Sequence, residues 1–350
     1  MPLSALNLPQ VDPTPIFEIF RGSYATELLA AAVAHFKVFE RLKDGPQSFD
    51  ALRAKCELAE RPAVVLFTAL RAMGLLGTNA KGELELTAQS REHLVPGGSF
   101  DVSGYVGLVA ESGGVKEMVE RLRTNKPAGA DKEKGAAFIY REGIESAMEK
   151  EASARHLTMA LAGRAKNCAP ALAHGVALNG AKVLLDIGGG TGIYSIACLQ
   201  KNPSLKAIVW DRPEVLKVAG EMARDYGVSE RLECRPGDFF ADAIPSGCDV
   251  ILLSNILHDW DVPQCRELLK KCAAALPAGG RVLIHDVFLN DDLSGPLAQS
   301  LYSAALFTLT EGRAYSAAEY RAWLVEAGLK PAAIVPTAVH CGVLAGTKGQ

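Results

Sequence analysis

Apolar residues recur at helical spacing through the first part of the chain, from Pro15 to Leu42, which predicts one or two amphipathic helices. Two more helical patterns follow, over residues 48–52 and 62–74. A turn then leads into residues 83–87, whose alternating apolar and polar side chains predict a short hairpin. Two helices and a hairpin in this order are typical of a winged helix.

Short apolar runs alternate with helical patterns in the second half of the chain. The runs with strand character cover residues 183–185, 207–210, 232–234, 250–253 and 282–284. This alternation predicts an α/β fold, with a mostly parallel sheet and helices on both faces. We expect a winged-helix-like domain over residues 1–100 and a second domain over 101–350, with a helical lead-in to about residue 180 and a Rossmann-like core over 181–350. The polar residues 124–135 predict a surface loop or hinge.

A winged helix can bind DNA through its second helix, which here covers residues 62–76. Arg71 is the only basic residue in that stretch, and apolar side chains surround the helix nearly completely, as in a helix buried by packing. The formal net charge of -3 and the pI of about 6.2 also indicate no basic face for phosphate groups. We therefore expect a small-molecule partner and no nucleic acid.

The cysteines and the N-terminal residues bear on the cellular compartment. Eight cysteines are scattered without a spacing that would indicate a zinc site or a disulfide framework, which favours a reducing compartment. Residues 1–11 lack the features of a signal peptide, and no apolar run reaches the roughly 18 residues of a membrane span. We expect a cytoplasmic protein that does not enter a membrane.

A glycine-rich stretch, DIGGGTG, follows the first strand of the predicted core, where the chain should turn into a helix. Glycines at such a turn let the backbone approach a ligand closely. The stretch does not satisfy the dinucleotide pattern, because the sixth position counted from Gly188 is Ile193 and not Gly or Ala. An acidic residue followed by G-x-G-x-G instead predicts that Gly188 and Gly190 cradle a cofactor with a sulfonium amino acid in place of a pyrophosphate.

Acidic residues follow the next two strands. Asp211 ends the second strand, where a carboxylate can accept hydrogen bonds from both ribose hydroxyls. Asp238 follows the third strand and can bind the adenine amino group, while Phe239 covers the ring. Each residue alone is more simply a turn, cap or core residue, but their succession at strand ends favours a cofactor site, because ligands of open α/β sheets bind there.

A histidine, His258, follows the fourth strand and should face the same crevice. A sulfonium can transfer a methyl group, and a neutral hydroxyl that accepts this group must lose its proton. A histidine with a pKa near 6.5 is a suitable general base for removing that proton. A histidine that only caps a helix is the alternative. Asp286, at the end of the neighbouring strand, could hold the second ring nitrogen of His258 and fix its tautomer.

The two His-Asp pairs at adjacent strand ends, His258-Asp259 and His285-Asp286, leave a metal site as another possibility, because imidazole and carboxylate groups both bind divalent cations. A third ligand at a recognisable spacing is not apparent in the sequence. We therefore expect no metal.

The motifs DIGGGTG, WDRP, GDFF, ILHDWD with Cys265 after it, and ALPAGGRVLIHD together resemble the plant-type O-methyltransferase family, which includes caffeate and acetylserotonin methyltransferases and bacterial polyketide-tailoring relatives. The resemblance implies a Rossmann-like methyltransferase domain that uses S-adenosyl-L-methionine to methylate a hydroxyl of an aromatic or polyketide-like small molecule. It also implies an N-terminal winged-helix-like domain that forms a homodimer and contributes residues to the partner's substrate pocket.

Carried over by motif, the resemblance makes His258 the base. It assigns cofactor binding to Gly188, Gly190, Asp211, Asp238, Phe239 and Ser254, and substrate binding to Met159 and Asp259. Plant members often have a lysine where this chain has Ser254. Their second catalytic glutamate falls on Ala314, and Glu311 or Arg313 are the residues that could compensate.

Two other functions fit parts of the pattern. A relative with the same fold could methylate carbon or nitrogen, or could have lost methyl transfer, as Ala314 and the second His-Asp pair suggest. A winged-helix regulator that senses the cofactor is the alternative from another class, and the apolar second helix argues against it.

Overall fold

The computed structural model describes residues 2–126 and 151–349, which divide into two compact units. Among these residues, the first unit contains 2–15, 151–288 and 317–349, and the second contains 16–126 and 289–316. The units do not follow the boundary expected at residue 100, because residues 101–126 and 289–316 pack with the N-terminal helices. Most of the loop expected over residues 124–135 lies outside the described residues.

The first unit is built on a mixed sheet with the order β10-β11-β7-β6-β3-β4-β5. The strands are β3 (Val183–Ile187), β4 (Lys206–Asp211), β5 (Leu232–Pro236), β6 (Val250–Ser254), β7 (Arg281–Leu289), β9 (Leu329–Pro331), β10 (Val335–Pro336) and β11 (Cys341–Lys348). Strands β3 to β7 are parallel, whereas β11 runs antiparallel to β7 and pairs with β9 and β10. All five predicted strand runs lie within β3 to β7 and are confirmed.

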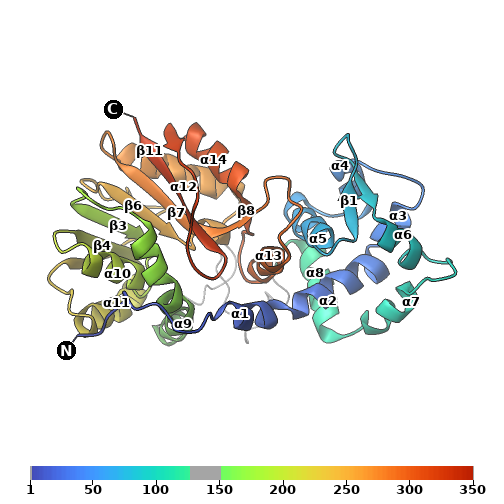
Figure 1. The fold of residues 1–350 in the computed structure, drawn as a ribbon, viewed down its shortest axis with the longest axis horizontal. Helices are drawn as coiled ribbons and strands as arrows, with labels where there is room; N and C mark the ends of the chain where they lie inside the picture. The colour runs from blue at the N-terminus through green and yellow to red at the C-terminus, as the bar shows by residue number, and fades with distance from the viewer. Residues whose placement is uncertain (1, 127–150, 350) are drawn as a thin grey trace. The chain divides into compact units, whose positions relative to one another are not determined.

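Helices cover both faces of this sheet (Figure 1). They are α9 (Glu151–Gly175), α10 (Ile193–Lys201), α11 (Pro213–Asp225), the 3-10 turn η3 (Leu257–Asp259), α12 (Val262–Ala275) and α14 (Ala317–Glu326). Figure 1 shows α9, α10 and α11 on one face and α12 and α14 on the other. The chain builds β4 and β5 on one side of β3 and then β6 and β7 on the other. The order reverses between β3 and β6, and ligands of such folds bind in the crevice outside the carboxyl ends of the strands at this point.

The second unit is mainly helical. Its elements are α1 (Thr14–Arg21), α2 (Ser23–Ala30), the π-helical turn η1 (Ala31–His35), α3 (Val38–Arg41), α4 (Phe49–Lys55), α5 (Glu60–Ala72), β1 (Leu76–Thr78), β2 (Leu84–Leu86), α6 (Ala88–His93), α7 (Ser103–Val106), the 3-10 turn η2 (Gly107–Val109), α8 (Gly113–Thr124), α13 (Leu297–Leu309) and β8 (Tyr315–Ser316). Helices α4 and α5 followed by the antiparallel pair β1-β2 have the predicted winged-helix order. Helix α5 is buried from Arg61 to Leu70, so it has no continuous exposed face for a DNA groove.

A buried arginine joins distant parts of this helical unit. Arg61, in the first turn of α5, donates hydrogen bonds of 2.9 Å to the carbonyl oxygens of both Thr310 and Gly312, just after α13. Its guanidinium carbon also lies 4.7 Å from the centroid of the Phe307 ring, on α13 itself. Residues 297–312 are therefore an integral part of the helical unit.

Within residues 2–126 and 151–349, no helix has both the length and the hydrophobicity of a membrane span.

Candidate active site

The glycine loop lies between the end of β3 and the start of α10. Gly188 and Gly190 have φ values of 63° and 59°, in the left-handed region that favours glycine. A Cβ atom on Gly188 would lie 2.5 Å from Cδ1 of Ile256, whereas one on Gly190 would have no atom within 4 Å. The loop therefore needs glycine at both positions and leaves open space beside Gly190, where a ligand can approach the backbone.

The carboxylate of Asp211, at the end of β4, is attached to this loop. Its Oδ2 accepts a hydrogen bond of 2.9 Å from the backbone N–H of Gly190, and its Oδ1 accepts one of 2.7 Å from the N–H of Arg212. Burial raises the pKa of Asp211, while the two N–H groups oppose the shift. The structure thus brings together two of the residues predicted to bind the cofactor.

A second carboxylate, that of Asp186, lies buried beneath the loop. Its Oδ2 accepts a 2.7 Å hydrogen bond from the hydroxyl of Ser195, whereas its buried Oδ1 has no hydrogen-bond partner among the residues that the structure describes. A Cβ atom on Gly189 would lie 2.7 Å from Cγ of Asp186. Burial raises the pKa of Asp186 to about 7.

The turn after β5 contains Asp238 and Phe239. Oδ1 of Asp238 accepts hydrogen bonds from the backbone N–H groups of Phe240 and Ala241, at 2.8 and 3.2 Å. Asp238 is exposed, and this carboxylate oxygen stabilises the turn. The turn therefore places Phe239 and Phe240 side by side at the end of β5.

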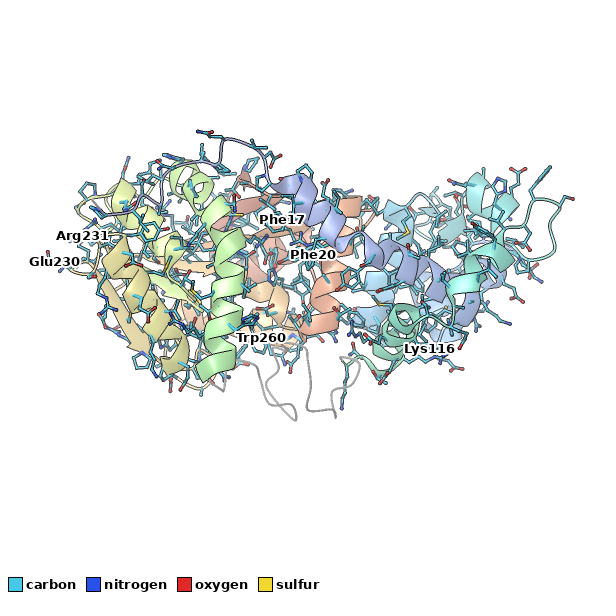
Figure 2. All side chains as sticks on the ribbon, turned by 90° about the horizontal axis from the view of Figure 1, so that it is seen from below. Phe17, Phe20, Lys116, Glu230, Arg231 and Trp260 are labelled. Atoms are coloured by element: carbon cyan, nitrogen blue, oxygen red, sulfur yellow. The ribbon has the colours of Figure 1, made fainter. Side chains whose placement is uncertain are left out.

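Two residues that the sequence analysis did not single out complete this region. Lys271 on α12 donates to three carbonyl oxygens of the turn, those of Phe239, Phe240 and Asp242, at 2.8, 2.8 and 2.7 Å. The ring centroid of Trp260, labelled in Figure 2, lies 6.0 Å from that of Phe239 and 4.8 Å from that of Phe240. Trp260 is part of the ILHDWD motif, so its sequence position was the available signal, but its aromatic neighbours were not predictable from the motif.

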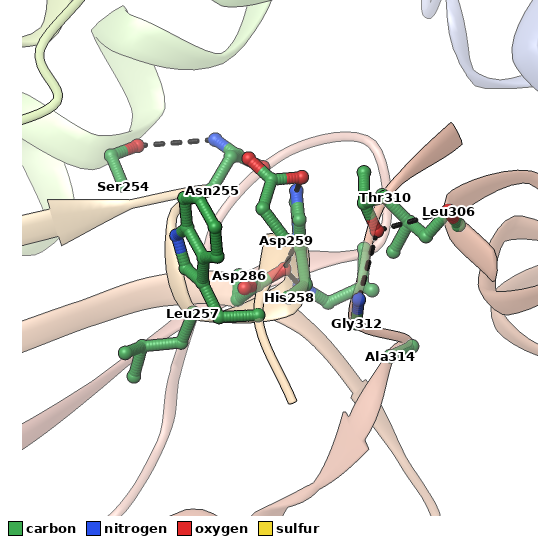
Figure 3. Close-up of polar contacts among 12 residues, drawn as sticks. Ser254, Asn255, Leu257, His258, Asp259, Asp286, Leu306, Thr310, Gly312 and Ala314 are labelled. Atoms are coloured by element: carbon green, nitrogen blue, oxygen red, sulfur yellow. Dashed lines mark hydrogen bonds and ion pairs between the residues drawn. The ribbon is translucent and has the colours of Figure 1, made fainter. Parts of the chain in front are cut away.

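His258 is buried in η3, just after β6, with 3% of its surface exposed. Its Nδ1 lies 2.6 Å from Oδ1 of Asp286 (Figure 3). Oδ1 of Asp286 also accepts the N–H of Val287 at 2.8 Å, and Oδ2 accepts the hydroxyl of Tyr320 at 3.2 Å. These contacts fix the carboxylate, so Nδ1 of the neutral ring is the nitrogen that donates a proton to it and Nε2 is left as the basic atom. The predicted pairing of His258 with Asp286 is present in the structure.

Asp259 lies on the other side of the imidazole. Its Oδ1 is 3.6 Å from Nε2 of His258. Burial disfavours the imidazolium, but the carboxylates of Asp286 and Asp259 outweigh this effect and raise the pKa of His258 above its usual 6.5. Burial raises the pKa of Asp259 to about 7, against the opposing effect of His258. The ring therefore lies between two acidic side chains, one at each nitrogen.

His285 does not form a second pair with Asp286. Its Nδ1 lies 2.8 Å from the hydroxyl of Ser254, and its Nε2 lies 3.1 Å from the hydroxyl of Thr337. Burial lowers the pKa of His285 to about 3, so the ring is neutral. In the part of the chain that the structure describes, no group of three His, Cys, Asp or Glu residues is placed to hold a metal ion.

The remaining predicted site residues are placed as follows. Met159, on α9 of the first unit, is 42% exposed. Ala314 is fully buried in the helical unit, where its N–H donates to the hydroxyl of Ser303 at 3.1 Å. Arg313 is buried beside it and donates to the carbonyl oxygen of Ala314 at 2.9 Å, and Glu311 is half-buried. Figure 3 also shows the neighbouring contacts of Thr310 with Leu306 and Gly312.

The parallel strands β3 to β7, with the antiparallel β11 beside β7 and helices on both faces, form the fold of a Rossmann-like methyltransferase domain. An O-methyltransferase domain model matches residues 129–330 of the chain. The 3-hydroxy-5-methyl-1-naphthoate 3-O-methyltransferase of Streptomyces sahachiroi is 35% identical over 342 residues, which cover 96% of this chain and 95% of the relative. This chain belongs to the O-methyltransferase family, whose methyl donor is S-adenosylmethionine.

Two further comparisons bear on the substrate. The crystal structure of an O-methyltransferase family 2 protein from Planctomyces limnophilus in complex with apigenin is 48% identical, with a TM-score of 0.89 over 99% of both chains. The L-tyrosine C(3)-methyltransferase of Streptomyces lavendulae is 29% identical over 321 residues, 89% of this chain and 86% of the relative. Proteins similar to this chain therefore include both oxygen and carbon methyltransferases.

Proposed function

We propose that this protein transfers a methyl group from S-adenosylmethionine to a phenol or enol hydroxyl of an aromatic or polyketide-like small molecule, with His258 as the general base. The observation that carries the proposal is the 2.6 Å contact between Nδ1 of the buried His258 and Asp286, at the carboxyl ends of β6 and β7. The naphthoate substrate in the name of the Streptomyces sahachiroi relative and the apigenin in the Planctomyces limnophilus structure support an aromatic acceptor.

The residues at the strand ends fit S-adenosylmethionine. The open space beside Gly190 admits the cofactor, and Asp211, already oriented by two backbone N–H groups, would bind the ribose. Asp238 and Phe239 would hold the adenine of the cofactor, and Ser254 would lie near its amino-acid part. When bound, S-adenosylmethionine supplies an electrophilic methyl group.

His258 would remove the proton of the acceptor hydroxyl. The O–H bond would break and an N–H bond would form at Nε2, leaving the ring as an imidazolium, while the oxygen would take the methyl group that the cofactor supplies, with S-adenosylhomocysteine as the other product. The negative charge of Asp286, 2.6 Å from Nδ1, stabilises that imidazolium and keeps the ring oriented. Asp259, near Nε2, and the partly exposed Met159 would contact the acceptor.

The activity can be tested directly with S-adenosylmethionine carrying a labelled methyl group and a panel of hydroxylated aromatic compounds that includes apigenin. We expect a labelled product whose methyl group is bound to oxygen, as determined by NMR. A product methylated on carbon would favour the function of the tyrosine C-methyltransferase relative. If S-adenosylmethionine binds but no acceptor is methylated, the result would favour the alternative that this protein has the methyltransferase fold but has lost methyl transfer.

The rate of methyl transfer should rise with pH. Only the neutral ring of His258 can accept a proton, and the pKa of His258 is raised. The midpoint of the rising limb of the pH–rate profile should therefore lie above pH 6.5. Asp286→Asn removes one of the carboxylates that raise this pKa, so the limb should move to lower pH and the rate should fall less than in a variant without the base. A pH–rate profile between about pH 5 and 9 measures both effects. A limb that stays in place in Asp286→Asn would mean that another group titrates.

We also propose that the protein is a homodimer formed through its N-terminal helices. Helix α1 exposes Ile16, Ile19 and Phe20 by 71, 79 and 78%, and clustered apolar residues of this kind mark interaction surfaces. Figure 2 labels Phe20 and the half-buried Phe17 on the same helix.

Light scattering should give twice the chain mass of 37.2 kDa, and Phe20→Glu should shift the protein towards the monomer. Phe100→Glu, at a 64% exposed position outside α1, is the matched control. A wild-type monomer at micromolar concentration would contradict the proposal.

A further inference from the structure

A tyrosine on α14, Tyr320, reaches the carboxylate that holds the ring of His258. Its hydroxyl donates a hydrogen bond of 3.2 Å to Oδ2 of Asp286, while Oδ1 of the same carboxylate lies 2.6 Å from Nδ1 of His258. The backbone N–H of Val287 is a second donor to Oδ1, at 2.8 Å. The two carboxylate oxygens therefore have different partners, since one faces the imidazole and the other faces the tyrosine.

The pleat of β7 directs Asp286 to this tyrosine. Successive side chains of a strand point to opposite faces, so Asp286 and Phe288 share the face that α12 and α14 cover, and His285 points to the other (Figure 1). The ring of Phe288 packs edge to face against that of Tyr320, with centroids 5.7 Å apart. The ring of Trp323, further along α14, packs against Tyr320 in the same way at 5.4 Å. These contacts hold the tyrosine ring in place and so fix the direction of its hydroxyl.

Helix α14 is itself attached to the helix that follows the proposed base. Arg266, on α12, donates to both carboxylate oxygens of Glu326, in the last turn of α14, at 2.7 and 2.6 Å. Helix α12 begins shortly after η3, the turn that contains His258. The tyrosine and the imidazole that meet at Asp286 are therefore carried by neighbouring elements that are bound to each other.

A buried tyrosine hydroxyl needs a hydrogen-bond acceptor, so this contact alone could serve packing only. Two features favour a role in the proton transfer. The side chains of Tyr320 and Asp286 are both buried, and a hydrogen bond to a charge is strong in such an interior. The acceptor is also the carboxylate whose other oxygen holds the ring of the proposed base.

The charge of Asp286 is shared between the hydroxyl and the imidazole. A hydrogen bond strengthens as its acceptor becomes more negative, so Tyr320 binds Asp286 more tightly when the ring is neutral than when a protonated ring offsets the charge. The hydroxyl therefore opposes protonation of His258. The other influences act on the ring separately: burial and Arg164, on α9, lower the pKa of His258, whereas Asp286 and Asp259 raise it.

We propose that Tyr320 is a positioning residue for the methyl transfer: its hydroxyl holds Oδ2 of Asp286 and takes up part of the carboxylate's charge, so that His258 binds its proton less tightly. The inference rests on the proposed function, since it requires His258 to act as the base. It gives the tyrosine a task that is separate from binding of the cofactor or the acceptor, because it determines the pH at which the base becomes available.

The pH–rate profile of Tyr320→Phe, measured in single turnovers, tests this task. The variant keeps the ring and removes the hydroxyl, so the rising limb should move about 0.3 to 1 pH unit higher and slow the transfer about 2- to 10-fold on the acid side. This direction is opposite to that expected for Asp286→Asn. Affinity for S-adenosylhomocysteine should stay unchanged. Tyr226→Phe is the matched control, because Tyr226 is also buried but lies between α11 and β5, at the amino ends of the strands.

A second variant strengthens the same hydrogen bond. The hydroxyl of 3-fluorotyrosine, introduced at position 320, is more acidic and is a stronger donor, so the limb should move to lower pH. The two variants should therefore shift the limb in opposite directions, while circular dichroism shows the same fold. If Tyr320→Phe does not fold, the fluorinated protein decides alone, and a limb that stays in place or moves to higher pH in that protein would overturn the proposal.

Two results in a folded Tyr320→Phe variant would also overturn the proposal. A limb that stays at the wild-type pH would reduce the hydroxyl to a packing role. A limb that moves to lower pH would show that Asp286 turns away from the ring when the hydroxyl is lost. A wild-type profile without a rising limb would contradict the proposed base itself, so the failure of the proposed function is distinguishable from the failure of this inference alone.

Discussion

Replacing His258 by alanine is expected to lower the rate of methyl transfer about 100- to 10,000-fold, the usual effect of losing a general base. Affinity for S-adenosylhomocysteine should stay nearly intact, because His258 is not among the proposed cofactor ligands, which follow β3, β4 and β5 or end β6. The rate is best measured in single turnovers, which separate the chemical step from product release.

His174→Ala is a matched control for this variant. His174 is an exposed histidine in the last turn of α9, whose Nε2 lies 3.3 Å from the carbonyl oxygen of Leu6. It should turn over like the wild type. Wild-type turnover in His258→Ala would mean that the acceptor is already ionised or that proximity alone suffices, and the assignment of the base would be withdrawn.

Asp211→Ala is expected to weaken binding of S-adenosylmethionine and S-adenosylhomocysteine by about 1.5 to 3 kcal/mol, or about 10- to 150-fold in Kd. The variant loses a charged acceptor for the ribose hydroxyls, and it also releases the N–H of Gly190 that orients the loop. Calorimetry measures the affinity, and circular dichroism should show an unchanged fold.

Asp225→Ala, at an exposed position near the end of α11, provides a control for the loss of one negative charge. Its affinity for the cofactor should equal that of the wild type. An Asp211→Ala variant with unchanged affinity would exclude Asp211 from the site.

The parallel strands were predictable from the sequence because buried strands appear as continuous apolar runs. Strand β11 was not predicted, although it extends over eight residues. Gly342 and Gly346 interrupt its apolar pattern, and glycine weakens a strand signal. The structure shows why glycine occurs there: a Cβ atom on either residue would lie 2.7 Å from a side-chain atom of Ile334 or Leu324.

The candidate site was also predictable only in part: residues at the strand ends could be predicted, whereas residues that reach the site from distant helices could not. The contact of His258 with Asp286 follows from two adjacent parallel strands that end at the same edge of the sheet. Tyr320 reaches Asp286 from helix α14, across 34 positions of sequence and without a motif, so no local pattern indicated it. The different surroundings of His285 and Asp286 follow from the pleat, because successive side chains of a strand point to opposite faces. That alternation was a sufficient reason not to expect the two residues in one site.

The hydrogen bonds that Arg61 donates to Thr310 and Gly312 have a consequence for how the protein folds during its synthesis on the ribosome. These two hydrogen bonds join residues that are separated by 249 and 251 positions in the sequence. Ala304 and Phe307 also belong to the same buried cluster as the N-terminal helices. Domains often fold as they emerge, the N-terminal one first. Here the helical unit cannot complete its core until α13 has left the exit tunnel, by which time most of the parallel sheet has already been synthesised. Its contacts are non-local, a property that slows folding, so residues 16–126, which are translated before the parallel sheet, belong to a unit that is completed late.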